Sequence, residues 1–123
     1  MGKRILIIED NEQNIYLVTF ILEKHGYDVI QARTGDQGLE MARLHHPEMI
    51  LLDIQLPGMD GYSVAQELRK LQDLVVTPII AVTSYAMPGD RENAIKAGCT
   101  GYIEKPIDPE TFMTQIENYM KPV

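Results

Sequence analysis

The chain has no tryptophan and a single cysteine, Cys99, among its 123 residues. One cysteine excludes an intrachain disulfide, so we interpret Cys99 as a small packing residue and expect a cytoplasmic protein, in a compartment that keeps thiols reduced. Long hydrophobic runs are also absent, because none approaches the ~20 residues of a membrane-spanning helix. The first run, residues 5–8, is too short for a secretory signal.

Positive charge is scarce, with 11 lysines and arginines against 18 aspartates and glutamates and a net charge of −7. This balance argues against a nucleic-acid partner, since phosphate backbones are bound by basic patches. The three histidines, His25, His45 and His46, lie near predicted helix ends and lack companion metal ligands, so we interpret them as surface residues. The length and composition fit one globular domain over residues 1–123, with no output domain.

Short apolar runs alternate with stretches of helical periodicity along the chain. Strands are predicted at residues 4–8, 27–30, 49–53, 78–82 and 101–103. Helices are predicted at about residues 12–24, 35–46, 61–71, 88–98 and 109–120. The predicted N-caps are Asn11, Thr34, Asp60 and Asp108, and Gln37 is predicted to reach back toward Thr34 in a capping box. The alternation predicts an α/β fold with a parallel sheet covered by helices on both faces.

For five such units we expect the flavodoxin-like, doubly wound (βα)5 sandwich with strand order 2-1-3-4-5. Asp53 ends a continuous apolar run that is typical of a central strand, and turn residues follow it. Glu9 and Asp10 follow the first strand, which this order places beside the third. The three carboxylates should converge at the edge where ligands bind, and their mutual repulsion favours a hard cation such as Mg²⁺.

Two more functional groups are predicted at the same edge. Thr83 follows the fourth strand and Lys105 follows the fifth. A metal ion, a lysine and a hydroxyl around one carboxylate form a site suited to phosphoryl charge, and a carboxylate can itself be the nucleophile. We expect Asp53 to carry an aspartyl phosphate, Asp10 and Glu9 to hold the metal directly or through water, and Lys105 to pair with the phosphoryl oxygens.

Residues 8–11, 52–61, 81–84 and 105–106 together resemble a response-regulator receiver domain of the CheY-like kind, and the resemblance extends over residues 3–120. It implies that Asp53 accepts a phosphoryl group from a histidine kinase or a histidine phosphotransfer protein in a two-component system or phosphorelay. It also implies Mg²⁺ as cofactor, with Asp10 as ligand, Glu9 acting through water, and the backbone carbonyl of Gln55 completing the protein ligands.

The same resemblance implies a conformational switch. Thr83 would move to bind the phosphoryl group, and Tyr102 would follow inward. Lys105 would bridge the phosphoryl group and Glu9 or Asp10, and the bond from Lys105 to Pro106 would be cis. Such a protein signals by contact with a downstream protein target, as a monomer or weak dimer, and catalyses only its own phosphoryl transfer and dephosphorylation. The sequence leaves open whether it is a diffusible relay intermediate or an allosteric ligand of a kinase.

Further residues are expected to tune the lifetime of the phosphoryl group and to contact partners. Gln55 and Tyr85 lie two residues beyond Asp53 and Thr83, and neither is acidic, so we predict slow autodephosphorylation. The candidate partner contacts are Leu17 and Phe20 toward the kinase, and Lys96, Tyr102 and Tyr119 on an output face.

Three alternative functions compete with this one. A flavodoxin-like electron carrier needs a phosphate-cradling loop after the first strand, and the acidic residues 9–12 would repel phosphate. A phosphatase of the haloacid dehalogenase class would want its nucleophile after the first strand and a second acid two residues on, and the sequence after Asp53 lacks it. A phosphorylation-independent interaction module of the same fold stays the serious alternative, and the intact site residues speak against it.

Overall fold

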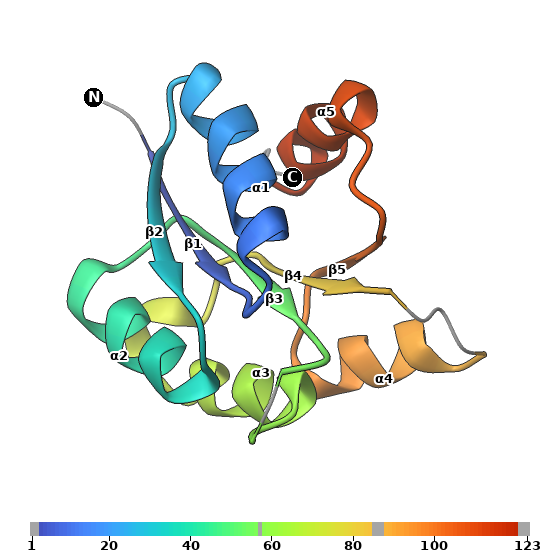
Figure 1. The fold of residues 1–123 in the computed structure, drawn as a ribbon. Coiled ribbons are helices and arrows are strands. Elements are labelled where there is room, and N and C mark those ends of the chain that lie inside the picture. The colour runs from blue at the N-terminus through green and yellow to red at the C-terminus, as the bar shows by residue number, and fades with distance from the viewer. Residues whose placement is uncertain (1–2, 57, 85–87, 121–123) are drawn as a thin grey trace.

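The computed structural model describes residues 3–56, 58–84 and 88–120 (Figure 1). Its strands are β1 (Arg4–Ile8), β2 (Asp28–Ala32), β3 (Met49–Asp53), β4 (Ile79–Thr83) and β5 (Gly101–Glu104). Its helices are α1 (Glu12–Lys24), α2 (Gly35–His45), α3 (Gly61–Arg69), α4 (Asp90–Ala97) and α5 (Pro109–Met120), with a short 3₁₀ helix η1 (Gln72–Leu74). In this part of the chain, no helix is both long and apolar enough to cross a membrane.

The five strands form one parallel sheet in the order β2-β1-β3-β4-β5, which confirms the predicted topology. The register pairs Ile8 with Leu52, Asp53 with Val82 and Thr83 with Glu104. The central strands β3 and β4 are buried along their whole length, as their unbroken apolar sequences predict. The carboxyl ends of β1, β3, β4 and β5 therefore meet at one edge.

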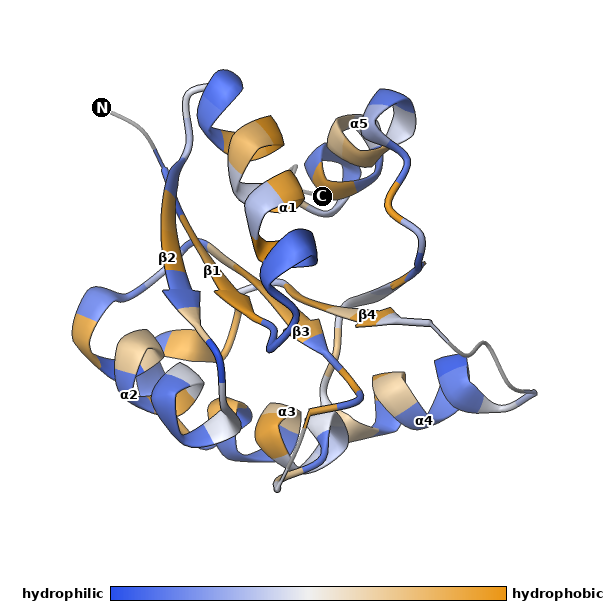
Figure 2. Cartoon of the chain, in the orientation of Figure 1, coloured by the Kyte–Doolittle hydropathy of each residue, from blue (hydrophilic) through white to orange (hydrophobic). Residues whose placement is uncertain are grey.

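Helices cover both faces of the sheet, with α1 and α5 on one face and α2, α3 and α4 on the other (Figure 1). Alternate strand residues point into two hydrophobic cores, because successive side chains of a strand face opposite sides. Ile5, Ile7 and Leu51 belong to the core under α1 and α5, while Ile8 and Leu52 belong to the core under the other three helices. Figure 2 shows β1 and β3 as largely hydrophobic strands between these layers.

Three helices begin at the predicted caps. The side chains of Asn11, Thr34 and Asp60 accept hydrogen bonds from backbone N–H groups three residues on, at 3.0, 3.1 and 3.0 Å. The capping box of α2 differs in one detail, since Oε1 of Gln37 accepts from the N–H of Arg33, at 2.8 Å, instead of from the cap residue itself. At α5, Asp108 Oδ1 accepts from the Glu110 N–H at 3.0 Å. The sequence thus located these helix starts correctly.

The ends of β2 and α3 were each predicted two residues from where the structure places them. β2 continues to Ala32 because its ladder with β1 runs as far as the Ile8–Ala32 pair. α3 ends at Arg69 instead of continuing to Leu71, since the N–H groups of Lys70 and Leu71 bond to carbonyls three residues back, at 3.2 and 3.1 Å. The tightened turn places Leu71 before η1, where it still packs against the core.

Candidate functional site

The predicted site residues do gather at the carboxyl edge of the sheet. Asp53 and Thr83 are the last residues of β3 and β4, and Glu9 comes directly after β1. Backbone hydrogen bonds continue beyond the strands: the Ile54 N–H donates to the Val82 carbonyl at 3.1 Å, and the Lys105 N–H donates to the Thr83 carbonyl at 2.7 Å. The sheet itself therefore fixes where these side chains begin.

Three carboxylates form the acidic part of the site. Glu9, Asp10 and Asp53 each offer an oxygen within 4.8 Å of the others. Glu9 and Asp53 are only 5% and 4% exposed, whereas Asp10 is exposed. A set of hard oxygen donors with one open side suits Mg²⁺, which binds a few carboxylates and keeps several waters. These residues therefore fit the metal that the sequence predicts.

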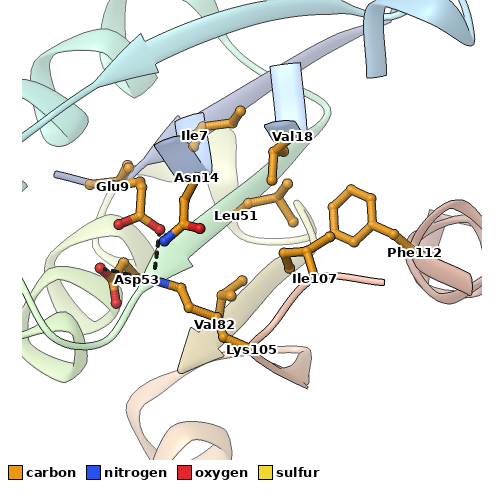
Figure 3. Close-up of a pocket in the computed structure, with 11 residues that line it drawn as sticks. Ile7, Glu9, Asn14, Val18, Leu51, Asp53, Val82, Lys105, Ile107 and Phe112 are labelled. Atoms are coloured by element: carbon orange, nitrogen blue, oxygen red, sulfur yellow. Dashed lines mark ion pairs between the residues drawn. The ribbon is translucent and has the colours of Figure 1, made fainter. Parts of the chain in front are cut away.

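Lys105 brings the positive charge of the site. Its Nζ lies 2.9 Å from Oε1 of Glu9 and 3.5 Å from Oδ2 of Asp53 (Figure 3), and its side chain is 11% exposed. The Lys105 ammonium thus pairs with two of the three carboxylates in the cluster. Burial raises the pKa of Glu9, the Lys105 ammonium lowers it, and the neighbouring Asp53 carboxylate raises it again, with a net upward shift. The negative charge of the site therefore exceeds its positive charge, and a further cation would be attracted to it.

Backbone donors hold the two buried carboxylates in place. The Gln55 N–H donates to Oδ1 of Asp53 at 2.9 Å, and the Asn11 N–H donates to Oε2 of Glu9 at 3.1 Å. The Gln55 side chain also accepts from the Ser84 N–H at 3.3 Å, which links the segments after β3 and β4. Each carboxylate thus has one oxygen held by the backbone and the other directed toward Lys105.

Thr83 and Tyr102 lie on neighbouring strands beside this cluster. Thr83 is 2% exposed, and the half-buried Tyr102 packs against the core under α2, α3 and α4. The Tyr102 hydroxyl is buried and has no hydrogen-bond partner among the residues that the structure describes. The Lys105–Pro106 peptide bond is cis, as the resemblance implied. Tyr85 lies outside the described residues, so its predicted shielding role stays a prediction.

The candidate partner residues differ in how exposed they are. Phe20 is 54% exposed and stacks on Tyr16, with ring centroids 6.4 Å apart, and Lys24 Nζ lies 5.8 Å from the Phe20 centroid. Leu17 is half-buried and packs against the core under α1 and α5. Lys96 on α4 is exposed, and the half-buried Tyr119 on α5 closely approaches Gly101 of β5. A shallow pocket lies between β5 and α5 and is lined by Tyr102, Ile103, Gln115, Asn118 and Tyr119.

Asn14 is a site residue that the sequence pattern did not reveal. It lines a small pocket together with Glu9, Asp53 and Lys105, and Figure 3 shows its amide pointing toward the Glu9 carboxylate. The rest of this pocket is mostly apolar, and Val18 lines it one helical turn further along α1. Asn14 lies four residues before the core residue Val18, and this spacing places it on the face of the helix toward the sheet. The sequence could have revealed Asn14 through this spacing.

Comparisons with known proteins agree with this geometry. The model of the response regulator receiver domain family matches residues 5–117. The chain belongs to this family. It is 43% identical over 120 residues to the polar-differentiation response regulator DivK of Brucella ovis, and the match covers 98% of each protein.

Solved receiver domains share the fold along nearly the whole chain. The receiver domain of the sensor histidine kinase PA1611 from Pseudomonas aeruginosa is 34% identical, with a TM-score of 0.89 and 98% of both chains covered. The crystal structure of that domain has a magnesium ion coordinated in its active site cleft. The BeF₃-activated receiver domain of RstA from Klebsiella pneumoniae is 28% identical, with a TM-score of 0.88, 98% of this chain and 100% of that chain covered. The chain is thus a DivK-like, CheY-like receiver domain of two-component signalling.

Proposed function

We propose that Asp53 accepts a phosphoryl group from a phosphohistidine on a histidine kinase or phosphotransfer protein, and that the chain works as a phosphorylation switch. The observation that carries this proposal is the buried Asp53 carboxylate, 3.5 Å from the Lys105 ammonium and within 4.8 Å of two further carboxylates. In the transfer, an Asp53 oxygen attacks phosphorus and the bond from phosphorus to the histidine nitrogen breaks. That nitrogen keeps the electron pair and takes up a proton from water.

The residues around Asp53 would prepare it for this attack. The Gln55 N–H fixes the orientation of the carboxylate through Oδ1. The Lys105 ammonium, held by Glu9 at 2.9 Å, is placed to pair with phosphoryl oxygens as negative charge accumulates. Thr83 ends the adjacent strand, where its hydroxyl would bind the transferred group. The positions of these residues at the strand ends support the proposed roles.

We propose that Glu9, Asp10 and Asp53, with the backbone carbonyl of Gln55, hold Mg²⁺. When bound, the ion would neutralise charge on the phosphoryl oxygens, which is its usual contribution to phosphoryl transfer. The close approach of the three carboxylates supports this assignment, since the single Lys105 ammonium beside them does not balance three negative charges. The magnesium ion in the active site cleft of the PA1611 receiver domain supports it as well.

Phosphorylation adds about −1.5 to −2 charge to the site. We propose that Thr83 and Tyr102 respond to this charge and change the surface that α4, β5 and α5 present to a protein target, with Lys96 and Tyr119 on that surface. On α1, the exposed Phe20 and its neighbour Leu17 would contact the phosphoryl donor. The chain would catalyse only its own phosphorylation and dephosphorylation, as expected for a signalling switch.

The test is incubation with acetyl phosphate and Mg²⁺, followed by intact-mass measurement of the wild type and of Asp53→Asn. We expect one phosphoryl adduct that requires Mg²⁺ and is absent in Asp53→Asn. The matched control is Asp36→Asn, which changes an exposed aspartate in the first turn of α2 and should keep the adduct. No adduct, or one that persists in Asp53→Asn, would contradict the proposal and favour a phosphorylation-independent interaction module.

A further inference from the structure

The outer face of α1 carries two large aromatic side chains that the fold leaves uncovered. Tyr16 is 74% exposed and Phe20 is 54% exposed, and their rings are stacked, with centroids 6.4 Å apart and an interplanar angle of 17°. The Lys24 ammonium lies over the Phe20 ring, 5.8 Å from its centroid. Aromatic side chains that already pack on each other lose little freedom when a partner covers them, so this face is suited to binding.

These residues form one continuous ridge along the helix. Glu12, Tyr16, Phe20 and Lys24 follow one another at intervals of four residues, and all four are exposed. Residues four apart are neighbours on the surface of an α-helix, and ridges of this spacing pack into the grooves of another helix. The ridge has an acidic residue in the first turn of α1 and a basic residue in the last turn. It therefore combines an aromatic centre with opposite charges at its two ends.

A second copy of α1 in the antiparallel direction would match this ridge. When two copies are aligned about Val18, the midpoint of α1, each Tyr16 lies opposite the partner's Phe20, because both positions are two residues from the midpoint. The same alignment sets Glu12 opposite the partner's Lys24. Among the residues that the structure describes, no carboxylate pairs with Lys24 within its own chain. The face is thus complementary to itself, as a dimer with two-fold symmetry requires.

The charged ends of the ridge orient the two helices more than they stabilise them. The Glu12 carboxylate already accepts a hydrogen bond from Arg33 Nη2 at 3.1 Å, and Arg33 Nε bonds to it as well. The partner's Lys24 would join this exposed pair as a third member and would gain little from it. The alignment also sets the exposed Gln13 opposite the partner's exposed Glu23, where an amide can donate to a carboxylate.

We infer that the outer face of α1 is a self-association surface, on which two copies of this chain form a weak antiparallel dimer centred on Tyr16 and Phe20. A single pair of helices gives an interface below the roughly 1,200 Å² of stable complexes, and two chains that each carry a net charge of −7 repel each other. The dimer is therefore transient, and it needs no phosphoryl group. Since Phe20 is also a proposed contact of the phosphoryl donor, dimer and donor would compete for α1.

Sedimentation equilibrium over a range of protein concentrations tests this dimer, and the amide chemical shifts of α1 on dilution give a second readout. Phe20→Asp should weaken association about tenfold or more, because it removes two apolar contacts and adds two negative charges per dimer. Leu44→Asp is the matched control, since Leu44 is an apolar residue on α2 with 55% exposure and the change in charge is the same. It should associate nearly as the wild type does, and both variants should keep the wild-type circular dichroism spectrum.

A gain of association tests the alignment itself. Gln13→Lys places an ammonium opposite the partner's Glu23 twice per dimer, so it should tighten the dimer about threefold. Gln66→Lys makes the same change in net charge at an exposed position of α3, and its smaller effect measures the general relief of repulsion. Adding Glu23→Gln to Gln13→Lys should remove the gain that exceeds this control.

Three results would overturn the inference. The first is a wild type that stays monomeric at every concentration. The second is an association that Phe20→Asp and Leu44→Asp weaken equally, and the third is a gain in Gln13→Lys no larger than that in Gln66→Lys. None of these results bears on the acetyl phosphate adduct of Asp53, so failure of the dimer and failure of the proposed function are distinguishable.

Discussion

Arg69→Met should destabilise the protein strongly although Arg69 lies outside the candidate site. The Arg69 guanidinium donates from Nε to the Gly98 carbonyl at 2.7 Å, and from Nη1 to the Leu74 and Thr77 carbonyls at 2.6 and 2.7 Å. Nη2 also donates to the Thr100 hydroxyl at 3.1 Å. One side chain thus satisfies acceptors from the segment between α3 and β4 and from the segment between α4 and β5.

The magnitude follows from these contacts. Counting about 1 kcal/mol for each of the three short bonds gives a loss of about 3 kcal/mol in the free energy of unfolding. For a domain of this size the loss corresponds to a Tm lower by about 10 °C. Methionine keeps much of the aliphatic packing, so the measured change reports mainly on the lost hydrogen bonds.

Thermal unfolding followed by circular dichroism measures this effect. Arg43→Met is the matched control, because Arg43 is an exposed arginine on α2 that pairs with Glu40 one turn away, and its removal should cost at most about 0.5 kcal/mol. If Arg69→Met and Arg43→Met have the same Tm, the reasoning is refuted. Water molecules must then replace the hydrogen bonds of the guanidinium without loss of stability.

Three further predictions concern the site. Asn14→Leu should weaken Mg²⁺ binding about tenfold in calorimetry, because the amide facing Glu9 supports a metal ligand, while Gln13→Leu on the exposed side of α1 should not; equal affinities would contradict this role. Without metal at pH 7, Glu9→Gln should raise the Tm, since burial raises the pKa of Glu9 and makes its ionised form unfavourable. The gain should shrink as the pH falls and vanish below the ordinary glutamate pKa of 4.5, where Glu9 is protonated whether folded or unfolded, and a gain independent of pH would rule out this cause. Finally, the phosphorylated protein should lose its phosphoryl group over minutes or longer at neutral pH, because neither Gln55 nor Tyr85 is acidic, and loss within seconds would disprove this.

Much of the fold could be predicted because apolar runs and helix caps are local signals. The unbroken run before Asp53 identified a strand buried on both faces, and its parallel neighbours then placed Glu9, Thr83 and Lys105 at one edge. The cap of α3 at Asp60 was likewise readable from its position before the periodic residues. These predictions depend on burial and short-range hydrogen bonds, which the order of residue types reveals directly.

The remaining contacts depend on how distant segments meet, and no local pattern records them. Arg69 is the last residue of α3, and it bonds to a carbonyl 29 residues away. Asn14 could have been placed on the inner face of α1, but its approach to Glu9 follows from the packing of α1 on the sheet.

The side chains of Asp53, Thr83 and Lys105 are attached to the sheet and not to the outer surfaces of the helices. The strand register positions the first two, and the hydrogen bond from the Lys105 N–H to the Thr83 carbonyl positions the third. The exposed helix surfaces can therefore change without moving these side chains. A designer who wishes to redirect this protein should graft residues onto the exposed faces of α1 and α5 and leave the strand ends untouched.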